Sequence, residues 1–343
     1  MNIHAIVLAA GKGTRMKSRL YKVMHPVCGK PMIAHVVDML DELPLDKRVV
    51  VIGHGSDAVR NLLGERVRYA YQHEQLGTAH AVLMSREMLQ HEDGVTIVLN
   101  GDTPLVRSET LKQLLLHHTH KQAAATILTA IVENPAGYGR VIRDERGDVI
   151  RIVEEKDATL GQKKISEIST GIFCFDNRKL FAYLAQVKNE NAQAEYYLPD
   201  VISILHAEGC TISAYVGDDP DEGRGANDRA QLAQLEALLR RRINQRHMQN
   251  GVSLIDPAAT YIDADVEIGQ DSVIYPGTFL RGKTKIEEGC SIGPHVQLVD
   301  CQVLSGTSLS FLHAKDRLIQ ADEAVGQIGE HIHPRLREIV TAR

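Results

Sequence analysis

The chain has 343 residues, of which 43% are hydrophobic and 24% charged, with a formal net charge of −5. This size predicts one large or two medium domains with buried cores. The basic residues are scattered, so neither a nucleic acid nor a membrane is an expected partner. No apolar run reaches the roughly 20 residues of a bilayer span, and no signal peptide is evident. With five cysteines and no CxxC pair, we expect reduced thiols in a cytoplasmic protein.

The first part of the chain alternates apolar runs with amphipathic stretches. Three runs rich in β-branched residues, at 3–10, 47–53 and 94–102, predict strands buried on both faces. Later strands are expected at 170–176 and 210–217. Helices are expected between them, at 31–42, 78–90 and 108–118. Residues 138–156 are typical of a hairpin with a Gly-Asp turn. The alternation predicts an α/β domain with a mostly parallel sheet.

The pattern changes after residue 228. One long helix is predicted at 229–248, and Asn250-Gly251 ends it. Aliphatic residues then recur every six positions, at Ile262, Ile268, Ile274, Leu280, Ile286, Ile292, Leu298 and Leu304. So short a period predicts a parallel β-helix.

These patterns divide the chain into four parts. We expect a catalytic or binding domain at 1–228, a linker helix at 229–250, a short β-helix at 251–305 and an atypical tail at 306–343. The tail either caps the open end of the β-helix or is partly disordered.

A glycine-rich loop, Ala9–Thr14, follows the first predicted strand. It fits neither the Walker A pattern nor the dinucleotide G-x-G-x-x-G pattern. Its small residues allow backbone N–H groups to approach phosphate oxygens. Arg15 would supply a planar fork and Lys22 a point charge. The alternative is an ordinary strand-to-helix turn with a solvated basic flank.

Two further polar positions suit a cation. Asp102 follows an apolar strand at the edge where α/β sheets bind ligands, and a carboxylate there suits Mg²⁺. The alternative is an N-cap for the helix expected at 108–118. Asn227 and Asp228 precede the long helix, where an N-cap role is the default for either residue.

Nine segments, taken together, resemble one protein family. They are "LAAGKGTRM", "LYKVMHPVCGKPM", "QHEQLGTAHA", "GDTPL", "GYGRV", "VEEKDA", "STGIF", "EYYLPDVI" and "GANDR". In this order they resemble the uridyltransferase domain of bacterial bifunctional N-acetylglucosamine-1-phosphate uridyltransferase/glucosamine-1-phosphate acetyltransferase. The six-residue repeat is similar to the left-handed β-helix of that family. The resemblance covers about residues 1 to 303.

The resemblance implies a Rossmann-like nucleotidyltransferase domain that transfers UMP from UTP to N-acetylglucosamine-1-phosphate and releases pyrophosphate. This reaction supplies UDP-N-acetylglucosamine for cell-wall precursors. The implied cofactor is Mg²⁺, and the implied assembly is a homotrimer through the β-helix. The catalytic residues would be Arg15, Lys22 and Asp102, with Asp102 and Asn227 as metal ligands. The substrate-binding residues would be Leu8, Ala9, Ala10, Gly11, Lys22, Gln72, Gly77, Thr78, Gly139, Glu154, Ser169 and Asn227.

The chain departs from the family at two places. Ser169 stands where the family has Asn, beside the expected sugar position, so sugar selection could be weaker or broader. The family's β-helix is longer and carries the acetyltransferase site, so no acetyltransferase activity is expected here. Two other functions stay open: a nucleotidyltransferase with another sugar phosphate or with ATP or TTP as donor, and a catalytically silent sugar-nucleotide-binding module.

Overall fold

The computed structural model describes residues 1–53 and 55–320. The chain forms two compact units. Unit 1 comprises residues 1–25 and 31–235, and unit 2 comprises residues 26–30 together with the chain from residue 236. The division therefore lies inside helix α8 (Arg229–Gln249) and not at residue 228. Among the described residues, no helix has both the length and the apolar character needed to cross a membrane.

A short excursion of the chain at residues 26–30 belongs to unit 2 because hydrogen bonds hold it there. Its strands are β2 (Pro26–Val27) and β3 (Lys30–Pro31). Between them, the Cys28 N–H donates to Glu236 Oε2 at 2.6 Å, and the Ala264 N–H donates to the Cys28 carbonyl at 2.9 Å. The sequence pattern did not predict that residues 26–30 belong to unit 2.

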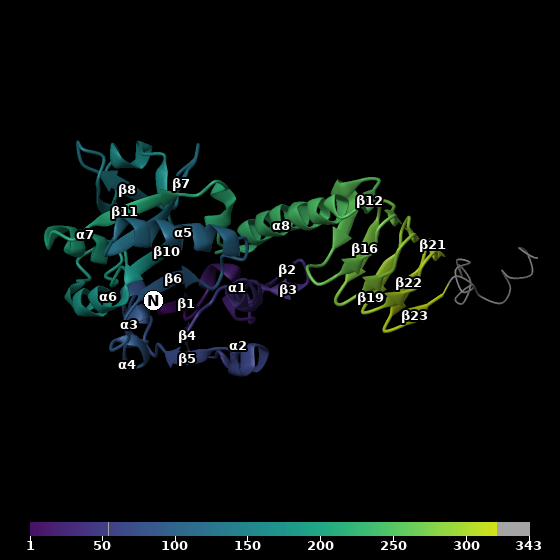
Figure 1. The fold of residues 1–343 in the computed structure, drawn as a ribbon, viewed down its shortest axis with the longest axis horizontal. Helices are drawn as coiled ribbons and strands as arrows, with labels where there is room; N and C mark the ends of the chain where they lie inside the picture. Colours follow the sequence, from purple (N-terminus) through teal and green to yellow (C-terminus); the bar gives the residue numbers. More distant parts are fainter. Residues whose placement is uncertain (54, 321–343) are drawn as a thin grey trace, which may run out of the picture. The chain divides into compact units, whose positions relative to one another are not determined.

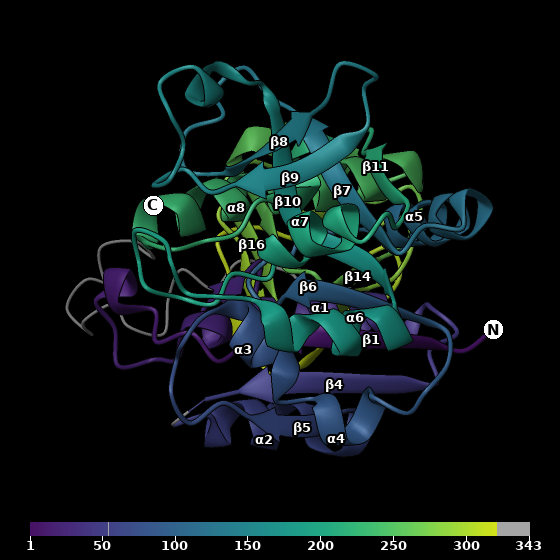
Figure 2. The same cartoon turned by 90° about the vertical axis from the view of Figure 1, so that its left-hand side faces the viewer.

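Unit 1 is built on a mixed sheet with the strand order β11-β7-β10-β6-β1-β4-β5 (Figures 1 and 2). The strands are β1 (Ile3–Leu8), β4 (Lys47–Ile52), β5 (Arg68–Tyr71), β6 (Val95–Asn100), β7 (Ala125–Ile131), β10 (Glu167–Asp176) and β11 (Ile212–Val216). Six of them run in one direction, and β10 runs antiparallel to its neighbours β6 and β7. The prediction of a mostly parallel sheet is confirmed.

The predicted hairpin is also present. Strands β8 (Gly139–Arg143) and β9 (Val149–Val153) pair antiparallel, and β8 joins the sheet through β10. The helices of unit 1 are α1 (Met32–Asp41), α2 (Asp57–Leu63), α3 (Thr78–Leu83), α4 (Arg86–Leu89), α5 (Ser108–Lys121), α6 (Asn177–Tyr183) and α7 (Asp200–Ala207). The single helix expected at 78–90 is two helices, because Ser85 Oγ donates to the Val82 carbonyl at the break.

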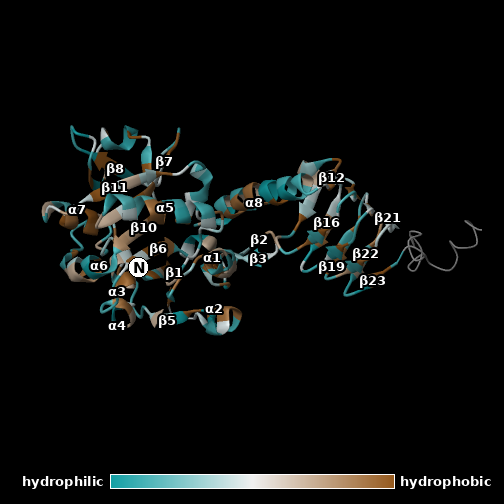
Figure 3. Ribbon diagram, in the orientation of Figure 1, coloured by the Kyte–Doolittle hydropathy of each residue, from teal (hydrophilic) through white to brown (hydrophobic). Residues whose placement is uncertain are grey.

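Both faces of the sheet are buried, as the β-branched runs predicted. Along β1, Ile6 belongs to one hydrophobic cluster, and its neighbours Ala5 and Val7 belong to the other. This alternation follows from the two-residue period of a strand. The central strands of unit 1 are accordingly brown in the hydropathy view, whereas α8 is mostly teal (Figure 3). The five cysteines are free thiols, as expected.

The parallel pairing of β1 with β6 brings their carboxyl ends together. Leu8 and Asn100 are register partners at the ends of these strands, and the Gly101 N–H donates to the Leu8 carbonyl at 2.9 Å. The glycine-rich loop and Asp102 consequently leave the sheet at the same edge, where ligands bind in open α/β sheets.

Up to residue 320, the described part of unit 2 contains three four-stranded parallel sheets, ordered β12-β15-β18-β21, β13-β16-β19-β22 and β14-β17-β20-β23. Successive strands join the three sheets in rotation. The strands are β12 (Ser253–Leu254), β13 (Thr260–Ile262), β14 (Glu267–Ile268), β15 (Val273–Ile274), β16 (Thr278–Arg281), β17 (Lys285–Ile286), β18 (Ser291–Ile292), β19 (Gln297–Val299), β20 (Gln302–Val303), β21 (Ser308–Leu309), β22 (His313–Lys315) and β23 (Leu318–Ile319).

The prediction that the repeat ends at residue 305 is wrong, because three further strands continue the sheets to Ile319. Leu304 is also not the core residue of its coil. Ile286 pairs with Val303, which is fully buried, and Leu304 follows it in the turn. The first residues of the predicted tail, up to 320, therefore continue the strands, and residues 321–343 lie outside the described residues.

The spacing between stacked residues explains the error. Early pairs are eighteen residues apart, as in Leu280 with Leu298. Later pairs are seventeen apart, as in Ile292 with Leu309, and then sixteen apart, as in Leu298 with Ala314. The turns shorten while the strands keep their stacking, so a search for a fixed period of six loses the later coils.

Candidate functional site

The glycine-rich loop is anchored at its start. The Ala9 N–H donates to the Val51 carbonyl at 2.9 Å, and the Tyr21 hydroxyl donates to the Ala9 carbonyl. Burial raises the pKa of Tyr21 to about 12, so the phenol stays protonated. Gly13 has φ +61°, and a Cβ on it would lie 2.6 Å from Cβ of Lys22. A glycine is required there because the Lys22 side chain passes directly against the loop.

Three polar side chains converge at the end of this loop. Lys22 Nζ lies 2.5 Å from Asp102 Oδ2 and donates to Asn227 Oδ1 at 2.8 Å. A Cβ on Gly225 would lie 3.0 Å from Asp102 Oδ2, so this glycine leaves room for the carboxylate. The Lys22 and Asp102 side chains are 16% and 13% exposed. The pair is consequently screened less by water than a surface ion pair.

The alternative N-cap roles of Asp102 and Asn227 are wrong. Asp228 Oδ1 accepts from the Gln231 N–H at 2.9 Å, so Asp228 caps helix α8. The Asn227 side chain is thereby left to accept from Lys22. Helix α5 begins after Arg107, several residues beyond Asp102, and has no side-chain cap.

A cavity of about 540 Å³ opens over the glycine-rich loop. Eleven of the predicted residues line it: Leu8, Ala9, Ala10, Gly11, Arg15, Lys22, Gln72, Gly77, Thr78, Asp102 and Asn227. We call it the loop cavity. Arg15 is exposed there and forms no ion pair with any described residue.

Gln72 and Gly77 form a fixed wall of the loop cavity. Gln72 is 3% exposed, and its Nε2 donates to the Gly77 carbonyl at 3.0 Å and lies 3.0 Å from His80 Nδ1. Gly77 has φ +118°, and a Cβ on it would lie 2.4 Å from the Tyr196 carbonyl oxygen. Only glycine fits this turn.

A second cavity of about 320 Å³ adjoins the first in unit 1. Eight predicted residues line it: Leu8, Lys22, Thr78, Asp102, Gly139, Glu154, Ser169 and Asn227. We call it the hairpin cavity, because β8 supplies Gly139 and the residue directly after β9 is its neighbour Glu154. Lys22, Asp102 and Asn227 line both cavities. Every predicted site residue therefore lies in one cavity or both.

The wall of the hairpin cavity is tightly packed. A Cβ on Gly139 would lie 2.9 Å from Ile152 Cγ2 and 3.3 Å from Glu154 Oε1. Arg140 is 1% exposed, donates to the Tyr138 carbonyl and pairs with Glu155 at 2.6 Å. The arginine of this ion pair is buried and the glutamate is 31% exposed, and the two bonds of Arg140 hold the backbone around Gly139 in place.

Glu154 is an ionisable residue that lines the hairpin cavity directly. Burial raises its pKa, and the negative charges of Asp200 and Asp157 raise it further, whereas Arg140 lowers it. Ser169, on β10, is 6% exposed, and its Oγ accepts from the Gly171 N–H at 3.3 Å. Its short side chain thus contacts its own backbone.

The sequence analysis did not select Asn100, Gln75 or Glu195, although each lines a cavity. Asn100 lines both, and a Cβ on Gly171 would lie 2.8 Å from its Nδ2. The signal was present for Asn100, because it is the last residue of β6 and immediately precedes Gly101-Asp102. Gln75 and Glu195 carry no such signal, and only the tertiary structure places them in the loop cavity.

The side-chain oxygens of Asp102 and Asn227, in the region shared by the two cavities, suit a hard cation. Asp102 and Asn227 each direct an oxygen at the Lys22 ammonium, which is itself a cation. Mg²⁺ prefers such oxygen ligands and takes only one or two from the protein when phosphates and water complete its shell. The described residues contain no cluster of three or more His, Cys, Asp or Glu that would form a closed metal site. The arrangement fits an ion that arrives with a phosphate.

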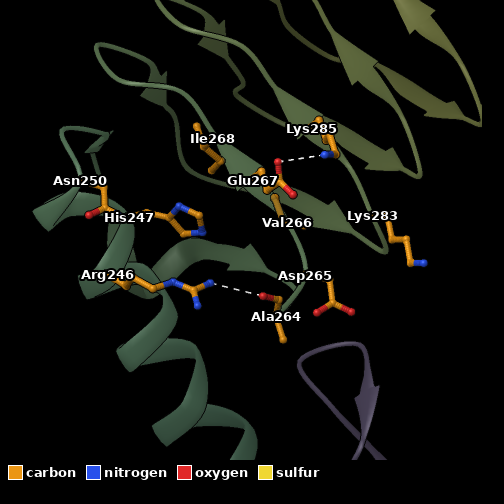
Figure 4. A pocket seen from close by; sticks show the side chains of 10 residues that line it. All are labelled: Arg246, His247, Asn250, Ala264, Asp265, Val266, Glu267, Ile268, Lys283 and Lys285. Carbon is orange, nitrogen blue, oxygen red and sulfur yellow. Dashed lines mark hydrogen bonds and ion pairs between the residues drawn. The ribbon is translucent and has the colours of Figure 1, made fainter. Parts of the chain in front are cut away.

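Unit 2 contains a cavity of its own, of about 580 Å³, beside the C-terminal end of α8 (Figure 4). None of the predicted site residues lines this cavity. Its lining includes Glu267, paired with Lys285 at 3.0 Å, and Asp265, paired with Lys30 at 2.5 Å. Arg246 donates to the Ala264 carbonyl at 3.3 Å.

The fold of unit 1 is that of an enzyme that transfers a nucleotidyl group, as a family model shows. The family model described as "Nucleotidyl transferase" matches residues 4–222, and the chain belongs to that family. A solved structure assigned as a glucose-1-phosphate thymidylyltransferase from Bacillus anthracis, in complex with a sucrose, has the same fold. Its TM-score is 0.56 at 22% identity, and the match covers 69% of this chain and 94% of that chain.

Curated relatives narrow the class further, and they share one name, "Bifunctional protein GlmU". The Brevibacillus brevis protein is 53% identical over 94% of this chain and 70% of the relative. The Geobacillus sp. protein is 53% identical over 96% of this chain and 72% of the relative. The Bacillus subtilis protein is 51% identical with the same coverage. The chain is a nucleotidyltransferase of the GlmU family.

Proposed function

We propose that this nucleotidyltransferase is a UDP-N-acetylglucosamine pyrophosphorylase. It transfers UMP from UTP to N-acetylglucosamine-1-phosphate and releases pyrophosphate, which supplies a precursor for cell-wall synthesis. The observation that carries the proposal is the pair of adjoining cavities that share Lys22, Asp102 and Asn227. A nucleotide in one and a sugar phosphate in the other would meet at these three residues. The relatives named GlmU, about half identical to this chain, support the same reaction.

The loop cavity is the proposed nucleotide site. Backbone N–H groups of the glycine-rich loop face the phosphates, with Arg15 and Lys22 as counter-charges. Gln72, Gly77 and Thr78 lie on its wall and are proposed to contact the uracil. The rigid turn at Gly77 would allow this contact without reorganisation of the protein.

The hairpin cavity is the proposed sugar site, with Gly139, Glu154 and Ser169 facing the sugar. Ser169 is too short to reach far into the cavity and is hydrogen-bonded to the Gly171 N–H. Selection among N-acyl groups then depends on cavity shape more than on this side chain. The finding that Asn100 lines both cavities places an amide beside the proposed reaction centre.

The reaction requires positioning and charge neutralisation. A sugar-1-phosphate oxygen attacks the α-phosphorus of UTP, and pyrophosphate leaves from the opposite side. The attacking phosphate is already ionised near neutral pH, so the chain does not need to supply a general base. Lys22 and Arg15 stabilise the negative charge that develops on the α-phosphate and the leaving group. Asp102 and Asn227 would hold Mg²⁺, which supplies further positive charge at the phosphates.

The three parallel sheets of unit 2 support a β-helix. From the family resemblance we propose that it is left-handed and that it forms a homotrimer. A cytoplasmic location and the absence of acetyltransferase activity stay predictions. Sedimentation at several protein concentrations tests the trimer, since a monomer throughout the concentration range would contradict it.

The proposed function is tested by pyrophosphate release with each of the four nucleoside triphosphates. Each is combined with N-acetylglucosamine-1-phosphate and, separately, with glucose-1-phosphate. We expect UTP with N-acetylglucosamine-1-phosphate to give the highest kcat/KM. Preference for another triphosphate or sugar would assign a different pyrophosphorylase. No release with any pair, from folded protein with Mg²⁺, would leave only a sugar-nucleotide-binding module.

A further inference from the structure

We propose that Lys22 is a built-in counter-ion for the cation site and that it makes metal binding depend on the nucleotide. The proposal rests on the proposed function and goes beyond it, because it assigns Lys22 a second position and a second role. Its basis is the contact of one ammonium with both proposed metal ligands: 2.5 Å to Asp102 Oδ2 and 2.8 Å to Asn227 Oδ1.

The two contacts occupy the same oxygens that a divalent cation would use. An ammonium and a metal ion cannot both lie within contact distance of one carboxylate oxygen without strong repulsion. Lys22 therefore competes with the metal for Asp102 while no phosphate is present. The side chains of Lys22 and Asp102 are largely buried, so water weakens this competition only in part.

The Lys22 side chain has a second possible position, in the loop cavity. It lines the loop cavity together with the glycine-rich loop, where the phosphates are proposed to bind. The base of its side chain, at Cβ and Cγ, lies against Gly13, so the loop is within reach of the flexible remainder of the side chain. A triphosphate offers several negative oxygens and would attract the ammonium away from Asp102. The two oxygens are then free to bind a metal ion that the same phosphates also hold.

The consequence is coupled binding of metal and nucleotide. Without nucleotide, Lys22 neutralises Asp102 and keeps the site formed but closed to cations. With nucleotide, Lys22 contacts phosphate and the metal takes its place. By thermodynamic linkage, the nucleotide raises the affinity for metal by the same factor as the metal raises the affinity for nucleotide. Lys22 supplies a large part of that factor.

The test measures binding of Mn²⁺, as a probe for the cation, by electron paramagnetic resonance or calorimetry without turnover. Without nucleotide, Lys22→Met should bind Mn²⁺ about tenfold or more tightly than the wild type, because a competing charge is removed. Lys22→Arg keeps the charge and should bind Mn²⁺ as weakly as the wild type. Lys17→Met is the control, because Lys17 is an exposed lysine close to the glycine-rich loop in sequence but is not among the residues that line either cavity, and the Mn²⁺ affinity of this variant should be unchanged.

A second measurement adds UTP without the sugar phosphate. UTP should raise Mn²⁺ affinity more in the wild type than in Lys22→Met, which has no ammonium to move. Equal or weaker Mn²⁺ binding by folded Lys22→Met, relative to wild type, would overturn the proposal. Asp102→Asn separates this from failure of the metal site itself. If Asp102→Asn binds Mn²⁺ as the wild type does, Asp102 is not a ligand and the proposed function loses its cation site.

Discussion

The loop cavity of unit 1 and the cavity of unit 2 have similar volumes, about 540 and 580 Å³, but their polar groups are arranged differently. In unit 2 the carboxylates are paired with lysines of unit 2 and are partly exposed to water. In unit 1, Arg15 has no ion-pair partner among the described residues, and one lysine contacts both the Asp102 carboxylate and the Asn227 amide oxygen. The two cavities therefore differ little in volume. They differ in their charged groups, because the side chains that converge in the loop cavity can still contact a ligand.

The glycines reinforce this difference. In the loop cavity, added Cβ atoms on Gly13 and Gly77 would collide with Lys22 and Tyr196. Glycine there permits close approach of backbone and side chain, as a phosphate site requires. Among the described residues, no glycine lines the unit 2 cavity of Figure 4. Four predictions test whether the comparison between the cavities is correct.

The largest effect is expected for Asp102→Ala. The variant loses the carboxylate that the proposed metal and Lys22 both use, so turnover should fall about 100-fold or more. Pyrophosphate release with UTP and N-acetylglucosamine-1-phosphate measures it, and circular dichroism shows that the variant is folded. Turnover like that of the wild type would remove Asp102 from the site and with it the contrast between the cavities.

An intermediate effect is expected for Gly139→Ala. The added methyl group would lie 2.9 Å from Ile152 Cγ2 and 3.3 Å from Glu154 Oε1, so the hairpin cavity must change shape. KM for the sugar phosphate should rise about tenfold, with KM for UTP nearly unchanged. Gly161→Ala is the control, because its Cβ has no neighbour closer than 4.0 Å. Equal changes in both KM values would mean that the two cavities do not divide the substrates.

A smaller effect concerns Asp200, which lines a further, acidic pocket of unit 1 together with Glu154 and Glu190. Burial, and then the charge of Asp157, raises the pKa of Asp200 from 3.8 to about 6. Between these pH values the folded state binds more protons than the unfolded state, so stability falls as pH rises. Asp200→Asn is neutral throughout and should be more stable than wild type by about 1 kcal/mol near pH 8, after allowance for solvent screening.

The gain should disappear near about pH 4, where the folded wild type is already protonated. Urea unfolding at both pH values measures it. Glu190→Gln is the control, since Glu190 lines the same acidic pocket but is 78% exposed, and no pH-dependent gain is expected from it. A gain for Asp200→Asn that does not vary with pH would show that its charge is not the cause.

The smallest effect is expected in the cavity of unit 2. The double variant Glu267→Gln, Lys285→Gln removes an ion pair whose side chains are 66% and 58% exposed. Its free energy of unfolding should change by less than about 0.5 kcal/mol, and turnover should not change. Thermal unfolding and pyrophosphate release measure the two quantities. A large loss of activity would show that paired charges in that cavity serve the reaction after all.

Much of the fold was predictable because its signals are local. The β-branched run that became β1 and the Gly-Asp turn between β8 and β9 both lie within single segments, and both predictions were confirmed. The end of the stacked strands in unit 2 was not predictable from a fixed period, since the turns shorten after Leu298 while pairing continues. The assignment of residues 26–30 to unit 2 depends on hydrogen bonds to Glu236 and Ala264, far along the chain.

The candidate site likewise has features that the sequence predicted and features that it left open. The glycine-rich loop, the carboxylate after β6 and the two polar residues before α8 were predictable from the sequence, because each belongs to a short motif. The sequence left open whether Asn227 or Asp228 caps the helix, since both have the right chemistry and spacing. The structure answers this question, because Lys22 donates to Asn227 across 205 positions of the chain, whereas Asp228 accepts from Gln231. Long-range contacts of this kind, like the parallel pairing of β1 with β6, form only when distant segments pack together, so no single segment specifies them.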